Sequence, residues 1–186
     1  DQSGNSRDAV QTSGSSQPKI VSSGTVVTEN SKPAVDMNIG GSTSSRLVPP
    51  ASFRAANINN YSLFTAQKPS GTNGSFGVRV GDAPDNRGYL PYNSGGTNYA
   101  SYGDTLTAIS LGSPPTDSQL LSFIAGSTQG NAQAFLDGSS QGSVSLQDHA
   151  QLGTVALGQG GNTGTMQEVV MFHNDQSANR TPIENN

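Results

Sequence analysis

Cysteine is absent from the 186-residue chain, so disulfide bonds and thiolate metal sites are excluded. Charge is also scarce: Asp, Glu, Lys and Arg make up 12% of the residues, against roughly 25% in ordinary globular domains. The basic residues are scattered singly and the formal net charge is −4, so we expect no nucleic-acid partner. No apolar run approaches the ~18 residues of a membrane-spanning helix, so we expect no membrane insertion.

Glutamate and lysine, which helical proteins place on their exposed faces, are rare, whereas glycine occurs 23 times. Uncharged polar residues with many glycines are typical of short strands joined by many turns. The length fits one domain of about 100–200 residues. We expect a single domain over residues 1–186 that belongs to a longer chain, because the sequence lacks an initiator Met and stops just after a helix-capping signal, Thr181-Pro-Ile-Glu184.

Short apolar or alternating runs of strand length recur along the chain, separated by Gly, Pro, Asn and Ser. In Phe76-Gly-Val-Arg-Val80, Arg79 falls on the opposite face from the apolar residues. Residues 134–137 and 142–146 flank a short link that contains Gly138, which predicts a hairpin. More than eight such runs predict a two-sheet antiparallel β-sandwich or jelly roll. The expected core residues are Leu63, Phe76, Val78, Leu121, Ile124, Phe135, Leu157, Val169 and Met171.

The carboxylates form no evident catalytic pair. Glycoside hydrolysis usually uses two carboxylates about 5–10 Å apart. Glu29, Glu168 and Glu184 are far apart in the sequence, and Glu168 has no partner carboxylate on its predicted strand. His149 and His173 lack the spacing of metal ligands. We therefore predict no catalytic residue and no enzyme.

Calcium is the metal for which the sequence offers suitable oxygen atoms. Residues 1–8 and 82–86 contain Asp and Asn side chains of the kind that bind calcium at a sheet edge. Neither segment matches a complete calcium loop, and Asx turns explain both more simply. We assign no cofactor and no metal site, with calcium as the alternative.

Residues 81–104 contain four of the five tyrosines, with Asn, Ser and Gly between them. Tyrosine rings offer flat area for sugar C–H surfaces, and Asn or Asp offers hydrogen bonds, as in binding loops. We expect a long loop at one rim of the domain. One hypothesis is that this loop binds a cell-surface glycan. The candidate residues are Tyr89, Tyr92, Tyr99 and Tyr102 for stacking, and Asp82, Asn93 and Asn98 for hydrogen bonds. The alternative is a loop whose tyrosines pack on the sandwich or on a neighbouring subunit.

Both ends of the chain resemble known modules. Residues 132–143 (AQAFLDGSSQGS) resemble a strand–turn–strand unit of laminin-G-like domains, and residues 164–186 resemble that family's closing strand and short helix. The opening DQSGNSRDAVQ resembles the catalytic domain of α-L-arabinofuranosidase family B and laminin-G-like modules of phage fibre and head-fibre proteins. The resemblance implies a concanavalin A-like jelly roll with a short C-terminal helix. Because the arabinofuranosidases carry cysteines around their site, no catalytic residue is transferred to this chain.

The resemblance to phage modules implies a non-enzymatic structural or adhesive part of a virus particle, such as a tail fibre or capsid decoration. On this hypothesis the chain resides in the virion, its partners are other virion subunits, and it forms a homo-oligomer, with a trimer favoured. The alternative is a secreted bacterial domain, extracellular, that binds carbohydrate or is related to glycoside hydrolases. A groove with paired carboxylates would favour the second hypothesis, and a threefold assembly would favour the first.

Overall fold

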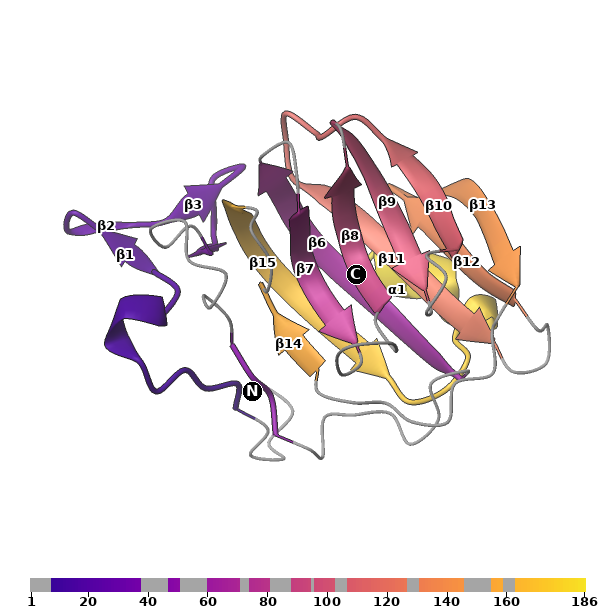
Figure 1. Cartoon of the computed structure of the whole chain (residues 1–186), viewed down its shortest axis with the longest axis horizontal. Coiled ribbons are helices and arrows are strands. Elements are labelled where there is room, and N and C mark those ends of the chain that lie inside the picture. Colours follow the sequence, from indigo (N-terminus) through magenta and orange to yellow (C-terminus); the bar gives the residue numbers. More distant parts are fainter. Residues whose placement is uncertain are drawn as a thin grey trace.

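Two antiparallel sheets packed face to face form the body of the protein (Figure 1). The structure is a computed structural model that describes residues 8–37, 47–50, 60–70, 74–80, 88–94, 96–102, 107–126, 131–145, 155–158 and 163–186. Within these residues, helix is limited to η1 (Gly14–Ser16), η3 (Ser177–Asn179) and α1 (Arg180–Glu184). None of the described helices is long and apolar enough to cross a membrane. The prediction of an all-β, two-sheet antiparallel sandwich with a short C-terminal helix is confirmed.

The larger sheet has six strands in the order β13-β12-β11-β6-β15-β5. Its strands are β5 (Val35–Asp36), β6 (Tyr61–Ser70), β11 (Gln119–Gly126), β12 (Asn131–Leu136), β13 (Ser139–Ser145) and β15 (Thr163–Phe172). The smaller sheet has five strands in the order β10-β9-β8-β7-β14. Its strands are β7 (Gly74–Val80), β8 (Gly88–Ser94), β9 (Thr97–Tyr102), β10 (Thr107–Gly112) and β14 (Val155–Leu157).

The predicted hairpin near Gly138 is confirmed as β12 and β13. The strands pair from Asn131↔Ser145 to Leu136↔Ser139. Asp137 and Gly138 form the two-residue turn with φ angles of 48° and 79°. Positive φ at both central residues matches the right-handed twist of the two strands, which is why Asp-Gly is a strong hairpin signal.

The core between the sheets draws on both of them. Tyr61, Leu63, Leu121 and Phe123 of the six-stranded sheet meet Val78, Ala100, Ile109 and Leu111 of the five-stranded sheet. Three predicted core residues, Leu63, Val78 and Leu121, are therefore confirmed, and each is at most 2% exposed. Leu157, Val169 and Met171 are partly buried against the same cluster. The side chain of Phe76 lies outside the described set.

Two predicted core residues lie on the other face of the six-stranded sheet. Ile124 is 3% exposed, but it alternates with Phe123 and Ala125, which face the inter-sheet core. Phe135 alternates with the inward Ala134 and lies beneath Arg180 of the C-terminal segment. The prediction that both residues lie between the sheets was wrong, because the C-terminal segment makes this second face apolar and covered as well.

The outer face of the six-stranded sheet is covered at two places. Near its β5 edge, Glu29 of the β3 strand (Thr28–Glu29) forms an ion pair with Lys68 of β6, at 3.1 Å between Nζ and Oε1. Strand β3 pairs with β4 (Lys32–Pro33), and β1 (Val21–Ser22) pairs with β2 (Thr25–Val26). At the other end, the hydroxyl of Ser62 donates to the carbonyl of Asn174 and accepts from the N–H of Gln176.

The short helix α1 differs from the expected capping box. It begins at Arg180 after Asn179, rather than after Thr181. Its Glu184 accepts hydrogen bonds from the side chain of Arg180, at the start of the same helix, and from Ser122 of β11. The C-terminal segment is therefore held by the sheet beneath it, behind β11 in Figure 1.

Candidate functional site

The tyrosine-rich segment forms strands instead of the expected rim loop. Residues 88–94 form β8 and residues 97–102 form β9, joined near Gly96, which has a φ of 84°. Tyr and Thr have high strand propensity, and the flanking strands β7 and β10 supply the partners that complete the sheet. Pro91, which lacks an N–H for the ladder, lies where the β8–β9 register shifts between Tyr89 and Tyr92.

The register assigns each tyrosine position to a face. Ala100 and Asn98 of β9 are 0% and 3% exposed, so their positions face the inter-sheet core. Tyr99 lies between them and takes the outer face, since successive strand residues alternate. Tyr92 pairs directly with Tyr99, and Tyr89 pairs with Ser101. Directly paired residues share a face, so positions 89, 92 and 99 lie together on the outer face.

Two rows of paired residues cross this outer face. The first row runs Ser75, Tyr92, Tyr99 and Ser110 over strands β7 to β10. The second row runs Ala156, Arg79, Tyr89, Ser101 and Ala108 over strands β14 to β10. With about 4.8 Å between strands, four strands span roughly 14 Å. Ala108 and Ser110 are exposed, so the face meets solvent at β10. We call these two rows the tyrosine face.

Arg79 is a member of the tyrosine face that the sequence reading did not include among the candidate binding residues. Its alternation with Val78 and Val80 already placed it on the opposite face from the core. Only the register of β7 against β8 brings it beside Tyr89. Strand order and register, rather than local pattern, were the missing information.

The other candidate residues lie elsewhere. Asn93 pairs with Asn98, and Tyr102 pairs with Thr107, two residues from the buried Ile109, so these positions share the inner face. The structure therefore separates Asn93, Asn98 and Tyr102 from the three outer tyrosine positions. Asp82 lies outside the described residues.

Asn98 borders a small pocket between the sheets. Gln67 of β6 and Gln119 of β11 supply polar groups, and Leu111, Leu121, Leu136 and Pro69 complete the lining. Its volume of about 10 Å³ holds about one water molecule. A sugar ring does not fit there, so Asn98 serves the interior of the sandwich and not a glycan site.

None of the three glutamates lies on a strand of the tyrosine face. Glu29 binds Lys68 and also accepts a hydrogen bond from Thr165 of β15 at 3.3 Å. Glu184 accepts hydrogen bonds from Ser122 and Arg180 on the outer face of the six-stranded sheet. Glu168 is exposed on β15. Within the described ranges, no group of three or more His, Asp or Glu residues could hold a metal ion. Residues 1–7, 81–87 and His149 lie outside those ranges.

No protein-family model and no curated protein sequence matches the chain. Several solved structures share its fold. The binding domain of botulinum neurotoxin DC, described in complex with SialylT, aligns with a TM-score of 0.60 at 8% identity, covering 85% of this chain and 44% of that one. Trypanosoma rangeli sialidase in complex with sialic acid aligns with a TM-score of 0.56 at 14% identity, covering 85% of this chain and 28% of that one.

A third structure is described with the statement that cell entry of botulinum neurotoxin type C depends on interaction with two ganglioside molecules. It aligns with a TM-score of 0.54 at 7% identity, covering 74% of this chain and 38% of that one. The chain thus spans less than half the length of each of these proteins. At such low identity the likeness establishes the fold class alone, which is an antiparallel β-sandwich.

Proposed function

We propose that the chain is a non-enzymatic carbohydrate-binding module and that glycan binds across the tyrosine face. The observation that carries this proposal is the register that brings Tyr89, Tyr92 and Tyr99 onto one face of two adjacent strands. Tyr92 and Tyr99 are directly paired, which puts these two positions about 5 Å apart, and Tyr89 lies on the same face three residues along β8; we take the three positions as one aromatic platform. Ser75, Ser101 and Ser110 add hydroxyl groups on the same face for hydrogen bonds to sugar hydroxyls.

At strand β10 this face meets solvent, because Ala108 and Ser110 are exposed. The opposite face is occupied by Glu29 at one end and by the C-terminal segment at the other. No described helix or strand crosses in front of β7, β8, β9 and β10 in Figure 1. A platform of this kind suits weak binding of single sugars, which many copies on one particle would strengthen.

The fold neighbours support a carbohydrate ligand in general terms. The botulinum neurotoxin structures are described with gangliosides or SialylT, and the Trypanosoma rangeli structures are described with sialic acid. Proteins of unrelated sequence share this sandwich while their functions differ. The neighbours therefore favour the ligand class, and the tyrosine face supplies the site.

The non-enzymatic part of the proposal rests on the carboxylates. Glu29 and Glu184 stabilise the fold through an ion pair and buried hydrogen bonds. Exposed Glu168 lies on β15 of the other sheet, away from the tyrosine face. The absence of a glutamate from the strands of the tyrosine face supports a module that does not use the two-carboxylate chemistry of glycoside hydrolysis there.

We further propose that the module belongs to a virus particle, as a tail-fibre or capsid-decoration domain that assembles as a trimer with other virion subunits. The sequence resemblance of both ends to phage modules, the absence of cysteine and the low surface charge support this setting. An extracellular carbohydrate-binding or glycoside-hydrolase-related domain of a bacterium is the alternative. Detection of the chain in purified particles supports the first setting, and its detection only in culture supernatant of uninfected bacteria contradicts it.

A glycan array printed in multivalent form tests the binding site. The wild type should bind a defined set of glycans, and the double variant Tyr92→Ala with Tyr99→Ala should lose that binding. The matched control Tyr92→Phe with Tyr99→Phe keeps both rings and should retain most of it. Unchanged binding by the alanine variant would move the site elsewhere, and no binding by the wild type would leave only a structural role.

A further inference from the structure

We infer that the glycan bound on the tyrosine face carries an anionic group, and that Arg79 binds this group. The inference rests on the proposed carbohydrate function and adds a ligand class and a residue that sets specificity. Its starting observation is the placement of Arg79 in the same row as Tyr89 and Ser101. A single cation beside an aromatic platform is the arrangement that recognises one acidic substituent on a sugar.

Arg79 occupies an interior strand of the sheet. Strand β7 has β8 on one side and β14 on the other, and Arg79 pairs with Tyr89 and with Ala156. Alanine is the smallest chiral residue, so on the β14 side of Arg79 the second row of the tyrosine face ends in a residue with only a methyl side chain. We infer that an anionic substituent of a sugar stacked on Tyr89 or Tyr92 approaches the Arg79 position from that side.

The charge pattern of the five strands isolates Arg79. The sequences of β7, β8, β9, β10 and β14 are GSFGVRV, GYLPYNS, TNYASY, TAISLG and VAL, and Arg79 is the one charged residue among them. The whole chain has a net charge of −4. A single positive position among the otherwise uncharged residues of these five strands attracts a single anion, whereas nucleic acids and other polyanions require several cations together.

Arginine, rather than lysine, is suited to the task. Its planar guanidinium offers a fixed fork of N–H donors that matches the two oxygens of a carboxylate or sulfate. Arg79 lies one strand from Tyr92 and in the next row, so the two positions are roughly 8–9 Å apart, and Tyr99, two strands away, is roughly 12 Å from Arg79. Acidic sugars, whether carboxylated or sulfated, share the chemistry that this site selects.

The test compares four ligands presented on a polymer: lactose, 3′-sialyllactose, the methyl ester of 3′-sialyllactose, and 3′-sulfolactose. The wild type should bind at least one of the two acidic ligands roughly tenfold more tightly than lactose, which corresponds to one charge-assisted hydrogen-bonded pair. The preference should fall as salt rises, because an exposed charge pair is screened. If the sialylated ligand is the preferred one, its methyl ester should bind like lactose.

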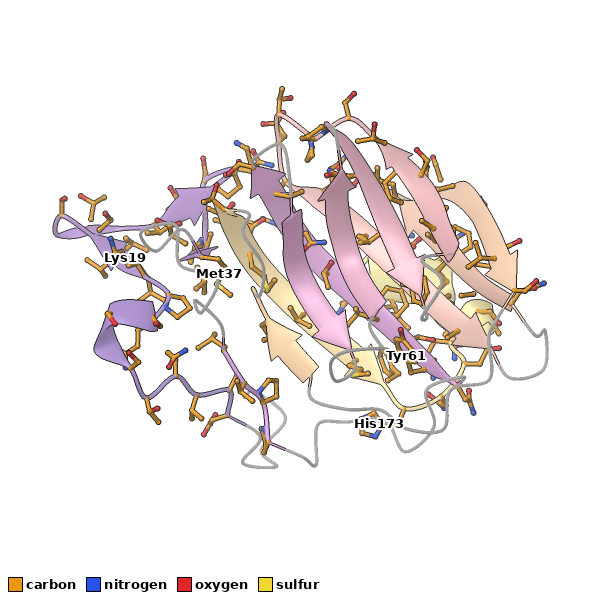
Figure 2. The ribbon with its side chains drawn as sticks, viewed as in Figure 1. Lys19, Met37, Tyr61 and His173 are labelled. Atoms are coloured by element: carbon orange, nitrogen blue, oxygen red, sulfur yellow. The ribbon has the colours of Figure 1, made fainter. Side chains whose placement is uncertain are left out.

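The variant Arg79→Gln should lose the acid preference while still binding lactose, and Arg79→Lys should keep part of the preference. Lys19→Gln is the matched control, since it removes the same charge from an exposed residue on the N-terminal arm, residues 8–33, at the left of Figure 2. It should behave as the wild type. Equal thermal unfolding midpoints would show that the variants are folded, and the esterified ligand tests the charge without any substitution.

Three results would overturn the inference. Equal wild-type binding of lactose and both acidic ligands would reject an anionic ligand and leave the carbohydrate function standing. An acid preference that survives Arg79→Gln would reject the role of Arg79. If the wild type binds none of the four ligands and no glycan on the array, the carbohydrate function itself is rejected, and the inference with it.

Discussion

Ser122 and Glu184 join the middle of the six-stranded sheet to the last helix of the chain. The Ser122 hydroxyl, on a residue that is 0% exposed, donates a 2.6 Å hydrogen bond to Oε1 of Glu184. The other carboxylate oxygen accepts from Arg180, whose guanidinium carbon lies 4.1 Å from the ring centroid of Phe135. One carboxylate thus fastens α1 over β11 and β12.

Replacing Glu184 should therefore lower the stability of the fold. Glu184→Ala removes the acceptor of the buried Ser122 hydroxyl and one of the two acceptors of Arg180, which also donates to the Gly138 carbonyl, and we expect a loss of about 2–3 kcal/mol in the free energy of unfolding. Urea unfolding followed by circular dichroism measures it. The matched control is Glu168→Ala, an exposed glutamate on β15, which should change stability by no more than about 0.5 kcal/mol. Equal effects of the two substitutions would contradict the role assigned to Glu184.

The turn at Gly138 should be sensitive to a side chain. Gly138 has a φ of 79°, and a left-handed conformation costs other residues roughly 1–2 kcal/mol. Gly138→Ala should lower the unfolding free energy by about that amount. A Cβ there would meet Glu184 Oε2 at 3.7 Å, an ordinary contact, so backbone strain rather than a clash is the cause. Gly14→Ala is the control, since a Cβ at Gly14 meets nothing within 4 Å.

The alternation of apolar residues and the Asp137-Gly138 signal were sufficient to predict most of the described strands and one hairpin, but not β8 and β9. Ile124 and Phe135 were assigned to the wrong face of the sheet. Alternation along a strand indicates that the strand has two faces, but it does not indicate that the distant C-terminal segment covers the second face. The tyrosine segment was expected as a loop because Gly, Asn and Ser are frequent in it. Its pairing with β7 and β10 depends on contacts between distant residues, and local composition does not encode them.

Asn98 and Tyr99 offer a direct comparison of the two faces, because they are neighbours on β9. Asn98 is 3% exposed and lines the internal pocket, whereas Tyr99 takes the outer position opposite Tyr92. We expect Asn98→Ala to lower the unfolding free energy by about 1–3 kcal/mol and to leave glycan affinity unchanged in the folded fraction. Tyr99→Ala should weaken glycan binding with a stability change of no more than about 1 kcal/mol. The reverse pattern would place the binding site inside the sandwich.

The protein should show no glycosidase activity. Arabinosides, xylans, β-glucans and sialosides should remain intact after long incubation, because the three glutamates form no catalytic pair on the tyrosine face. Reducing-end assays and chromatography of the products provide the measurement. Turnover that disappears in Glu168→Gln would demonstrate catalysis and restore the glycoside hydrolase as the function.

The proposed trimer can be tested through the hairpin β1–β2, which projects away from the sandwich at the left of Figure 1. Val21 and Val26 pair across it and are 49% and 54% exposed. A two-stranded hairpin with two residues in each strand is marginal alone in water, and an exposed apolar pair favours contact with another subunit. Light scattering over a range of concentrations should give three times the monomer mass. Val21→Asp with Val26→Asp should shift the assembly toward monomer, because unpaired carboxylates would then enter an apolar contact.

Ser22→Asp with Thr25→Asp adds the same charges to the opposite face of the hairpin and should leave the trimer intact. A wild type that remains monomeric at every concentration and makes no contact between copies in the native particle would reject the trimer.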